Sequence, residues 1–261
     1  MVCVLLCDGT NFNTITPRAS PRQQERLFLE ILNTTLQLIT SGDATLWGIV
    51  ALSLRISLSA TLIAALLAIP LGTGLAMGRF LGRRVIIMLS SSLMALPPVV
   101  VGLAIYLLLS RAGPFGEYGL LFTPTAMIIA QSVLIFPIIL ALTTEAVSPL
   151  EQTYRPLLHS VNASHWFRLK TLIIDARFAI FTALLAGFGR AIAEVGAVII
   201  VGGNIAGLTR VMTTTIALET SKGNLELALA LGLILISLAI IVNTIIHSLK
   251  SIGQKYQRTS R

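Results

Sequence analysis

Five long apolar stretches run through this 261-residue chain and dominate what it can fold into. A helix needs about 20 apolar residues to cross a bilayer, and each stretch is close to that length or longer. Five such helices in one soluble domain would have no polar outer faces. The sequence therefore predicts an all-α, polytopic membrane protein with five transmembrane helices. The expected spans are residues 46–77, 85–109, 125–143, 179–201 and 225–249.

The composition supports a membrane location. The chain is 55% hydrophobic and 11% charged, with a mean hydropathy of +0.87, whereas soluble domains carry about 25% charged residues. The net charge of +8 does not indicate a nucleic-acid-binding protein, because the basic residues lie between apolar runs. In membrane proteins such residues mark cytoplasmic loops, so we exclude nucleic acid as a partner and expect contact with membrane lipid.

Lysine and arginine are concentrated in alternate connections between the spans. The basic connections carry Arg79, Arg83, Arg84, Arg155, Arg168, Lys170, Arg177, Lys250, Lys255, Arg258 and Arg261. The connections between spans on the other side carry only Arg111, Arg210 and Lys222. Because cytoplasmic loops carry the excess of basic residues, the N-terminus is predicted outside and the C-terminus in the cytoplasm.

The N-terminal region has two parts. Residues 1–26 form an extension of unknown status, in which Cys3 and Cys7 are interpreted as unpaired thiols because no second pair of ligands accompanies them. No metal site is expected. Residues 27–39 have apolar side chains on one helical face and polar ones on the other, which predicts an interfacial helix on the membrane surface. Gly42 is expected to end that helix and Asp43 to cap the next one.

A long basic connection, residues 148–177, precedes the last two spans. It is long for a link between helices, and its apolar and aromatic residues at helical spacing predict two short helices, 149–160 and 164–174. Asn162 tolerates the left-handed conformation that a sharp turn between them needs. The hairpin suits docking to another protein, with a hairpin lying on the membrane surface as the alternative.

Several stretches resemble the permease subunits of bacterial ABC importers. The family's coupling loop reads E-A-A, three residues, G, nine residues, I-x-L-P, and this chain has Asn162 at the glycine and "SVNASHW" where the family has S-L-G-A-S-R-W. Pro156, Leu157 and Leu158 replace E-A-A. "SLRISLSATLIAALLAIPLGTGLA" and "LMALPPVVVGLAIYLLLS" look like the first two core spans. "GFGRAIAEVGAVIIVGGNIAGLTRVMTTTIALETSKGN", residues 187–224, resembles the tungstate-type branch of the molybdate, sulfate and tungstate permeases.

The resemblance implies a type I ABC importer permease fold over residues 27–261, in the inner membrane of a prokaryote. It implies a homodimer, a dimer of ATPase subunits and an extracytoplasmic oxyanion-binding protein as partners. ATP and Mg would bind the ATPase, and no cofactor is expected on this chain, which lacks the G-x-x-x-x-G-K-[ST] phosphate loop. The implied substrate is tungstate, with molybdate or sulfate as the near alternative and a channel or secondary transporter as the remote one. The implied ATPase coupling segment is Ser160, Val161, Asn162, Ala163, Ser164, His165 and Trp166.

Arg190 and Glu194 are full charges inside the fourth apolar stretch. A charge in mid-span costs about 2.5–3.5 kcal/mol on the insertion scale, but the spacing of four residues allows the two to pair. If the stretch is one helix, small and charged residues share a face: Ala183, Ala186, Gly187, Arg190, Glu194, Ala197, Val198 and Val201. The lipid-facing side would hold Phe181, Leu185, Phe188, Ile192, Val195 and Ile199. We interpret Gly187, Arg190, Glu194 and Ala197 as lining or gating a translocation path, with a structural ion pair as the alternative.

The outer segment "GGNIAGLTRVMTTT" is a candidate for contact with the anion. Its glycines leave backbone N–H groups uncovered, and a tetrahedral dianion binds many such donors. The side chains expected to contribute are Arg210, Thr209, Thr213 and Thr214. The alternative is a glycine-rich turn followed by a re-entrant or interfacial helix. No catalytic residue is predicted, because no nucleophile, carboxylate pair or metal cluster stands out.

Overall fold

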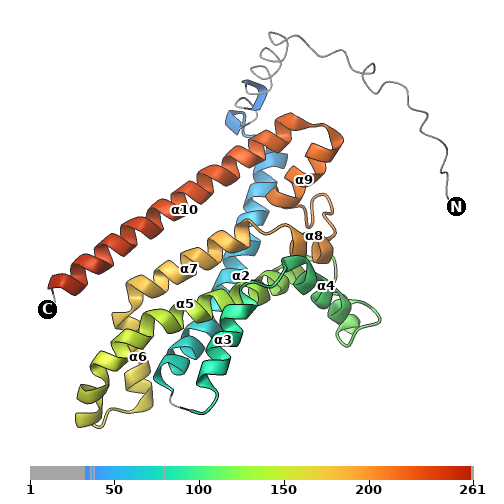
Figure 1. Ribbon diagram of the computed structural model, residues 1–261. Helices are drawn as coiled ribbons and strands as arrows, with labels where there is room; N and C mark the ends of the chain where they lie inside the picture. The colour runs from blue at the N-terminus through green and yellow to red at the C-terminus, as the bar shows by residue number, and fades with distance from the viewer. Residues whose placement is uncertain (1–32, 36, 38, 79, 260–261) are drawn as a thin grey trace, which may run out of the picture.

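The computed structural model describes residues 33–35, 37, 39–78 and 80–259. Within this part every regular element is helical (Figure 1). The elements are α2 Ala44–Met77, α3 Arg83–Leu93, α4 Pro98–Leu109, the 3₁₀ turn η1 Gly116–Tyr118, α5 Pro124–Ser160, α6 His165–Asp175, α7 Arg177–Ile192, α8 Gly196–Gly202, α9 Met212–Lys222 and α10 Leu225–Thr259. The extension 1–26 and most of the expected interfacial helix 27–39 lie outside the described residues.

The described helices reach the five predicted spans only if two bent pairs of helices are each counted as one span. Among the described residues, α2, α5 and the Leu225–Leu249 part of α10 are long and apolar enough to cross a membrane alone. Two bent pairs also pass that test: α3 with α4, bent by 99°, and α6 with α7, bent by 72°. The first bend lies at Pro97 and Pro98, where a proline ring cannot continue a helix without losing a backbone hydrogen bond.

The start of α2 follows the sequence closely. Gly42 has a positive φ of 71°, a conformation that glycine adopts without strain. Asp43 is the N-cap of α2, and its carboxylate accepts a hydrogen bond from the backbone N–H of Leu46 at 2.8 Å. Both predictions for this turn are confirmed.

The third span is longer than predicted. We expected a membrane helix at 125–143 and a separate loop helix at 149–160, and the structure has the single 37-residue helix α5. At 1.5 Å per residue, α5 is roughly 55 Å long, well beyond the ~30 Å hydrocarbon core. Apolar runs mark only the part of a helix that is inside the membrane, so they gave no sign that α5 continues outside it.

The fourth span is not the continuous helix that was assumed. The structure ends α7 at Ile192 and begins α8 at Gly196, with an irregular segment between them. The assumption of one continuous helix over residues 179–201 is therefore wrong. The burial predicted beyond Ile192 is nevertheless confirmed, since Val195 and Ile199 are exposed and the residues expected on the protected face are buried: Glu194, Ala197, Val198 and Val201. The predicted exposure is wrong for Phe188 and Ile192, which were expected to meet lipid but are buried with α2, α9 and α10.

Helices α2 and α5 form the core of the bundle and make its most extensive contact between two helices. The seam is made of small residues on α2, Ala60, Ala64, Ala65 and Ala68, against Ile135 and Ile139 of α5. At Gly72 an added Cβ would lie 2.9 Å from the carbonyl oxygen of Leu140, so only glycine allows this approach. Without a hydrophobic drive between helices in lipid, such close packing provides the association energy.

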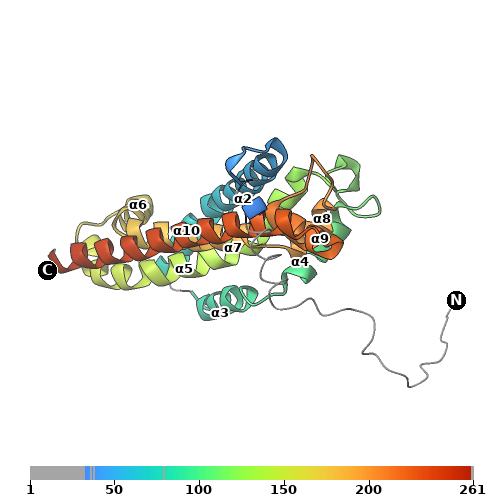
Figure 2. The same cartoon turned by 90° about the horizontal axis from the view of Figure 1, so that it is seen from above.

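The basic connections gather at one end of the molecule. The C-terminal end of α10, the turn between α5 and α6, and the link from α2 to α3 lie together (Figure 1). The start of α2, helices α8 and α9, and the loop after α4 lie at the opposite end, and the view turned by 90° shows the same separation (Figure 2).

Candidate functional site

Arg190 and Glu194 form an ion pair at the break between α7 and α8. The Nη1 atom of Arg190 lies 2.5 Å from Oε2 of Glu194. The other carboxylate oxygen of Glu194 accepts a hydrogen bond from the backbone N–H of Ala197 at 3.2 Å, in the first turn of α8. The guanidinium thus stands at the negative end of α7 and the carboxylate at the positive end of α8, where each charge complements the local helix dipole. We call these residues, 190–197, the α7–α8 junction.

Side chains from neighbouring helices bind the carbonyl groups that the break exposes. The buried side-chain amide of Gln131, on α5, donates to the carbonyl of Ala191 at 3.0 Å. The hydroxyl of Thr213, on α9, donates to the carbonyl of Glu194 at 2.9 Å. An unsatisfied buried carbonyl is costly, so these bonds stabilise the broken span. Gln131 was not predicted, because a lone glutamine in an apolar stretch carries no signal of its partner.

The two side chains of the ion pair differ in their exposure to solvent. The side chain of Glu194 is 4% exposed, whereas that of Arg190 is 38% exposed. Between the pair and Gln131, Leu134 and Ile135 there is about 0 Å³ of space for a water-sized molecule. The junction therefore packs against α5 without a gap. The side chain of Arg190 is partly exposed on the side that faces away from α5.

Gly187 and Ala197 make close contacts between helices of the same chain. A Cβ at Gly187 would meet the side chain of Ile139 on α5 at 2.9 Å. Ala197 is buried against Gly102 of α4, where a Cβ would lie 2.6 Å from the Cα of Ala197. Both positions hold helices together at van der Waals distance. Their role in lining a path stays a prediction.

Replacing Gly102 with valine is expected to destabilise the packing of α4 on α8. Overpacking typically costs about 1–3 kcal/mol, and more where the clash is with backbone, as here. The measurement is the midpoint of thermal unfolding in detergent, together with the yield of folded chain. Gly232→Val is the matched control, since a Cβ at Gly232 of α10 meets nothing within 4 Å. Equal midpoints for the two variants would contradict the close approach of α4 and α8.

The predicted anion contacts of the outer segment are engaged inside the chain. The hydroxyl of Thr209 donates to the carbonyl of Gly202 at 2.6 Å, and that of Thr213 to Glu194 as described above. Thr214 lies 2.9 Å from the side-chain oxygen of Asn204. A hydroxyl has one proton to donate, so an anion at these threonines would have to displace an existing bond. Arg210 differs, because its Nε is buried and has no hydrogen-bond partner.

The hairpin formed by α5 and α6 is closed by a buried carboxylate. Glu151 of α5 is 1% exposed, and its Oε1 accepts hydrogen bonds from Arg155 at 3.0 Å and from Arg168 of α6 at 3.1 Å. Oε2 accepts a second bond from Arg155 at 2.6 Å. We call this group the Glu151 clamp. The spacing of Glu151 and Arg155 signals a helical pair in the sequence, but nothing in the sequence indicated Arg168 as the third member.

The predicted coupling segment forms the tip of this hairpin. Ser160 ends α5, Asn162 has the expected positive φ of 47°, and Ser164 caps α6 through a hydrogen bond from Phe167 N–H at 3.3 Å. Val161, Ala163, His165 and Trp166 occupy the turn and the start of α6. The exposed apolar side chains here are Leu157, Val161, Trp166 and Phe167. The turn at Asn162 is confirmed, and the tip presents apolar surface outside the membrane helices.

Residues 68–251, which contain both the junction and the hairpin, match the family described as binding-protein-dependent transport system inner membrane component. The chain belongs to this family. Its multi-pass helical architecture, its broken spans and the hairpin before the last two spans are thus those of the membrane subunit of a transporter.

Individual relatives of this transporter subunit are similar over most of their length. A probable anion ABC transporter permease protein of Haloferax volcanii is 40% identical over 202 residues, 76% of this chain and 87% of the relative. The tungstate uptake system permease protein TupB of Peptoclostridium acidaminophilum is 40% identical over 215 residues, 82% of this chain and 94% of the relative. TupB of Campylobacter jejuni is 40% identical over 168 residues, 64% of this chain and 70% of the relative.

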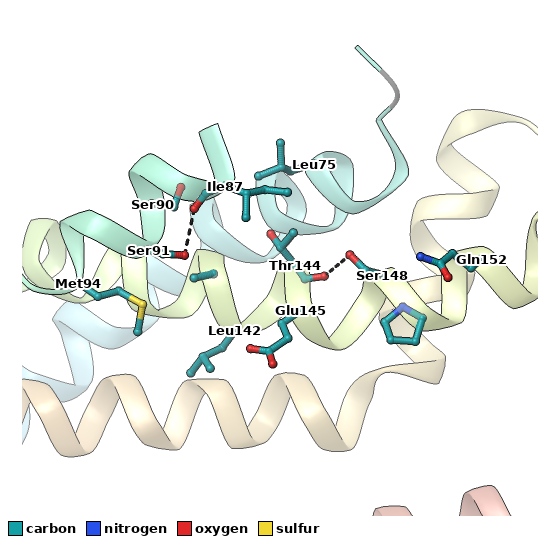
Figure 3. Close-up of a pocket in the computed structure, with 12 residues that line it drawn as sticks. Leu75, Ile87, Ser90, Ser91, Met94, Leu142, Thr144, Glu145, Ser148 and Gln152 are labelled. Carbon is teal, nitrogen blue, oxygen red and sulfur yellow. Dashed lines mark hydrogen bonds between the residues drawn. The ribbon is translucent and has the colours of Figure 1, made fainter. Parts of the chain in front are cut away.

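A cavity of about 450 Å³ lies between α2, α3 and α5 of the permease, toward the basic end (Figure 3). Its hydroxyl groups are occupied: Ser91 donates to Ile87, and Ser148 to Thr144, as the dashed lines show. Glu145 lines the same cavity, is exposed, and forms no ion pair with the described residues. The carboxylate of Glu145 repels an anion, so this cavity of the single chain is a poor resting place for one even though Gln152 also lines it.

Proposed function

We propose that this chain is the permease subunit of an ABC importer that carries tungstate across the cytoplasmic membrane. The observation that carries the proposal is the 40% identity to the tungstate uptake permease TupB of Peptoclostridium acidaminophilum over 94% of that protein. The matched part includes the α7–α8 junction, where a charged pair is kept inside a membrane span at a cost. Molybdate and sulfate have the same charge and tetrahedral shape and are the competing substrates.

We propose three partners for the chain, and its surfaces support them. The hairpin tip around Trp166 is the docking element for an ATPase subunit, which supplies ATP and Mg. A second copy of this chain covers the open side of Arg190, so that the path runs between two permeases, and an oxyanion-binding protein delivers the substrate outside. The clustering of the basic connections at the hairpin end supports a cytoplasmic hairpin and C-terminus, with the start of α2 outside (Figure 1).

The substrate is tested by metal accumulation in the native cell. Deleting the gene is expected to abolish uptake of nanomolar tungstate, measured as cellular tungsten by mass spectrometry, and the plasmid-borne gene should restore it. Excess molybdate or sulfate added with tungstate shows whether either competes for the same system. Unchanged tungsten content in the deletion strain, with reduced molybdenum or sulfate uptake, would contradict tungstate as the substrate.

Replacing Trp166 with alanine is expected to weaken the ATPase interface without harming the fold. The side chain is 75% exposed, so the free energy of unfolding should change by no more than about 0.5 kcal/mol. A buried aromatic anchor contributes about 2 kcal/mol or more to an interface, which is roughly a 30-fold loss of affinity. The measurement is ATPase binding to the purified permease.

The control for this variant is Phe115→Ala, an exposed aromatic on the loop at the opposite end. It should leave ATPase binding unchanged. If Trp166→Ala binds the ATPase as tightly as wild type, the hairpin tip is not the docking element.

A further inference from the structure

Two arginines at the outer end of the molecule line one cavity. Arg55 comes from the outer third of α2 and Arg210 from the loop between α8 and α9, and Gly207 of that loop lies beside them. The cavity has a volume of about 460 Å³, within the roughly 300–1,000 Å³ of pockets that bind small molecules. No acidic residue lines it among the residues that the structure describes.

Neither arginine has a partner in the described part of the chain. The buried Nε of Arg210 has no acceptor, and Arg55 forms no ion pair or side-chain hydrogen bond there. By contrast, Arg155, Arg168 and Arg190 are each paired with a carboxylate, although the buried Nε of Arg168 also has no acceptor. A buried guanidinium N–H left without an acceptor is costly, so that of Arg210 is expected to meet an acceptor that the chain does not supply.

The carboxylate that acts on Arg210 is already engaged. Hydrogen bonding from Lys222 is the main cause that lowers the pKa of Glu219, with smaller contributions from Asn224 and from the charge of Arg210. The Nζ of Lys222 lies 2.9 Å from one carboxylate oxygen, and the side-chain amide of Asn224 lies 3.1 Å from the other. Glu219 therefore lowers the net positive charge near the cavity but leaves the donors of Arg210 free.

The remaining surroundings of the cavity are apolar. Its walls include Ala44, Gly48, Ala51 and Leu52. Below Arg55, exposed leucines continue on the same face of α2 at helical spacing: Leu58, Leu62 and Leu66. A guanidinium pair at the top of an apolar face matches a phosphate group attached to acyl chains.

We propose that this cavity is a binding site for a tetrahedral oxyanion group, held by Arg55 and Arg210. Arginine presents several donors in a planar fork that fits phosphate-like oxygens, and two such forks supply the charge and the donors that a monoanion or dianion needs. The leucine face indicates the phosphate of an anionic lipid as the source, and free tungstate offers the same chemistry. The site does not depend on the proposed function.

The test uses the purified full-length chain in a neutral detergent. Phosphatidylglycerol, diacylglycerol with the same acyl chains, and sodium tungstate are titrated separately, with bound ligand counted by native mass spectrometry. We expect saturable binding of phosphatidylglycerol at one strong site, and weakening by roughly tenfold or more in both Arg55→Gln and Arg210→Gln. Arg111→Gln, an exposed arginine at the same end outside the cavity, is the matched control and should bind like wild type.

Each outcome has a defined meaning. Tungstate binding that both variants lose, with no selective lipid binding, keeps the oxyanion site and assigns it to the transported ion. Equal binding of diacylglycerol and phosphatidylglycerol together with no binding of tungstate would overturn the proposal. Unchanged binding of both anionic ligands by the Arg55→Gln, Arg210→Gln double variant would also overturn it. If a glutamine variant fails to fold, the same titrations are made with Arg55→Lys and Arg210→Lys, which retain the charge at each position.

Discussion

Replacing Glu194 with alanine is expected to remove most of the folded permease from the membrane. The carboxylate is nearly fully buried and joins Arg190 of α7 to the first turn of α8. Removing one partner of a buried pair typically costs about 3–5 kcal/mol, because the other charge is left without compensation. Whole domains are stable by only about 5–15 kcal/mol, so such a loss is large. The measurement is the yield of monodisperse protein and its thermal unfolding midpoint.

A second substitution separates the loss of the pair from the loss of a side chain. The uncharged double variant Arg190→Gln, Glu194→Gln removes both charges and keeps similar volumes, so it should regain most of the folded yield. Glu117→Ala, an exposed carboxylate on η1, should behave like wild type. If Glu194→Ala alone folds as well as wild type, the ion pair does not hold the α7–α8 junction.

The same double variant tests the predicted gate. If Arg190 and Glu194 control passage of the anion, the assembled double variant should transport tungstate at least about tenfold more slowly than wild type. A charge-assisted hydrogen bond from Arg190 to the dianion is worth about 1.5–3 kcal/mol, and the variant loses it. Transport is measured per assembled complex, which separates it from the folding effect. Normal transport by the assembled variant would leave the pair a packing role only.

Replacing Glu151 with alanine is expected to loosen the hairpin and uncouple the ATPase. The substitution leaves Arg155 and Arg168 facing each other's charge in a largely buried position, a cost again of about 3–5 kcal/mol. Since α6 packs on α2 and α5 through few contacts, the loss should act locally on the hairpin tip. We expect faster proteolysis within residues 160–165 and loss of substrate-stimulated ATP hydrolysis, both measured on the reconstituted complex.

The matched control for the clamp is Glu145→Ala. It removes an exposed carboxylate from the same helix, less than two turns before Glu151, where no ion pair is lost. It should change neither proteolysis nor ATP hydrolysis. Unaltered coupling in Glu151→Ala would show that the clamp does not position the docking surface.

The sequence predicted the apolar spans because a helix that is buried in lipid needs a long run of apolar residues. It also predicted the turn at Asn162 and the cap at Asp43, which depend on one residue and its neighbours. It did not predict the break after Ile192, since no proline marks it and the spacing of Arg190 and Glu194 fits a continuous helix. The break is stabilised by Gln131 and Thr213 from other helices, which only the folded structure brings together.

The sequence predicted the ion pair of the candidate site correctly, but it placed both residues on one continuous helix, which is wrong. Arg190 and Glu194 were expected to pair because they are four residues apart, and they do. Their geometry is different from that of a continuous helix, because the carboxylate caps α8 instead of lying on the surface of α7. The Glu151 clamp to Arg168 and the cavity of Arg55 and Arg210 join residues far apart in the sequence, so periodicity within one segment could not reveal them.

The most direct test of the account is uptake of tungstate into proteoliposomes. The permease is reconstituted with its cognate ATPase and oxyanion-binding protein, and tungsten inside the vesicles is measured with time. The account predicts accumulation that requires ATP and the binding protein and that falls sharply in the Glu151→Ala complex. Tungstate entry by the permease alone, without ATP, or no entry with all components present would contradict it.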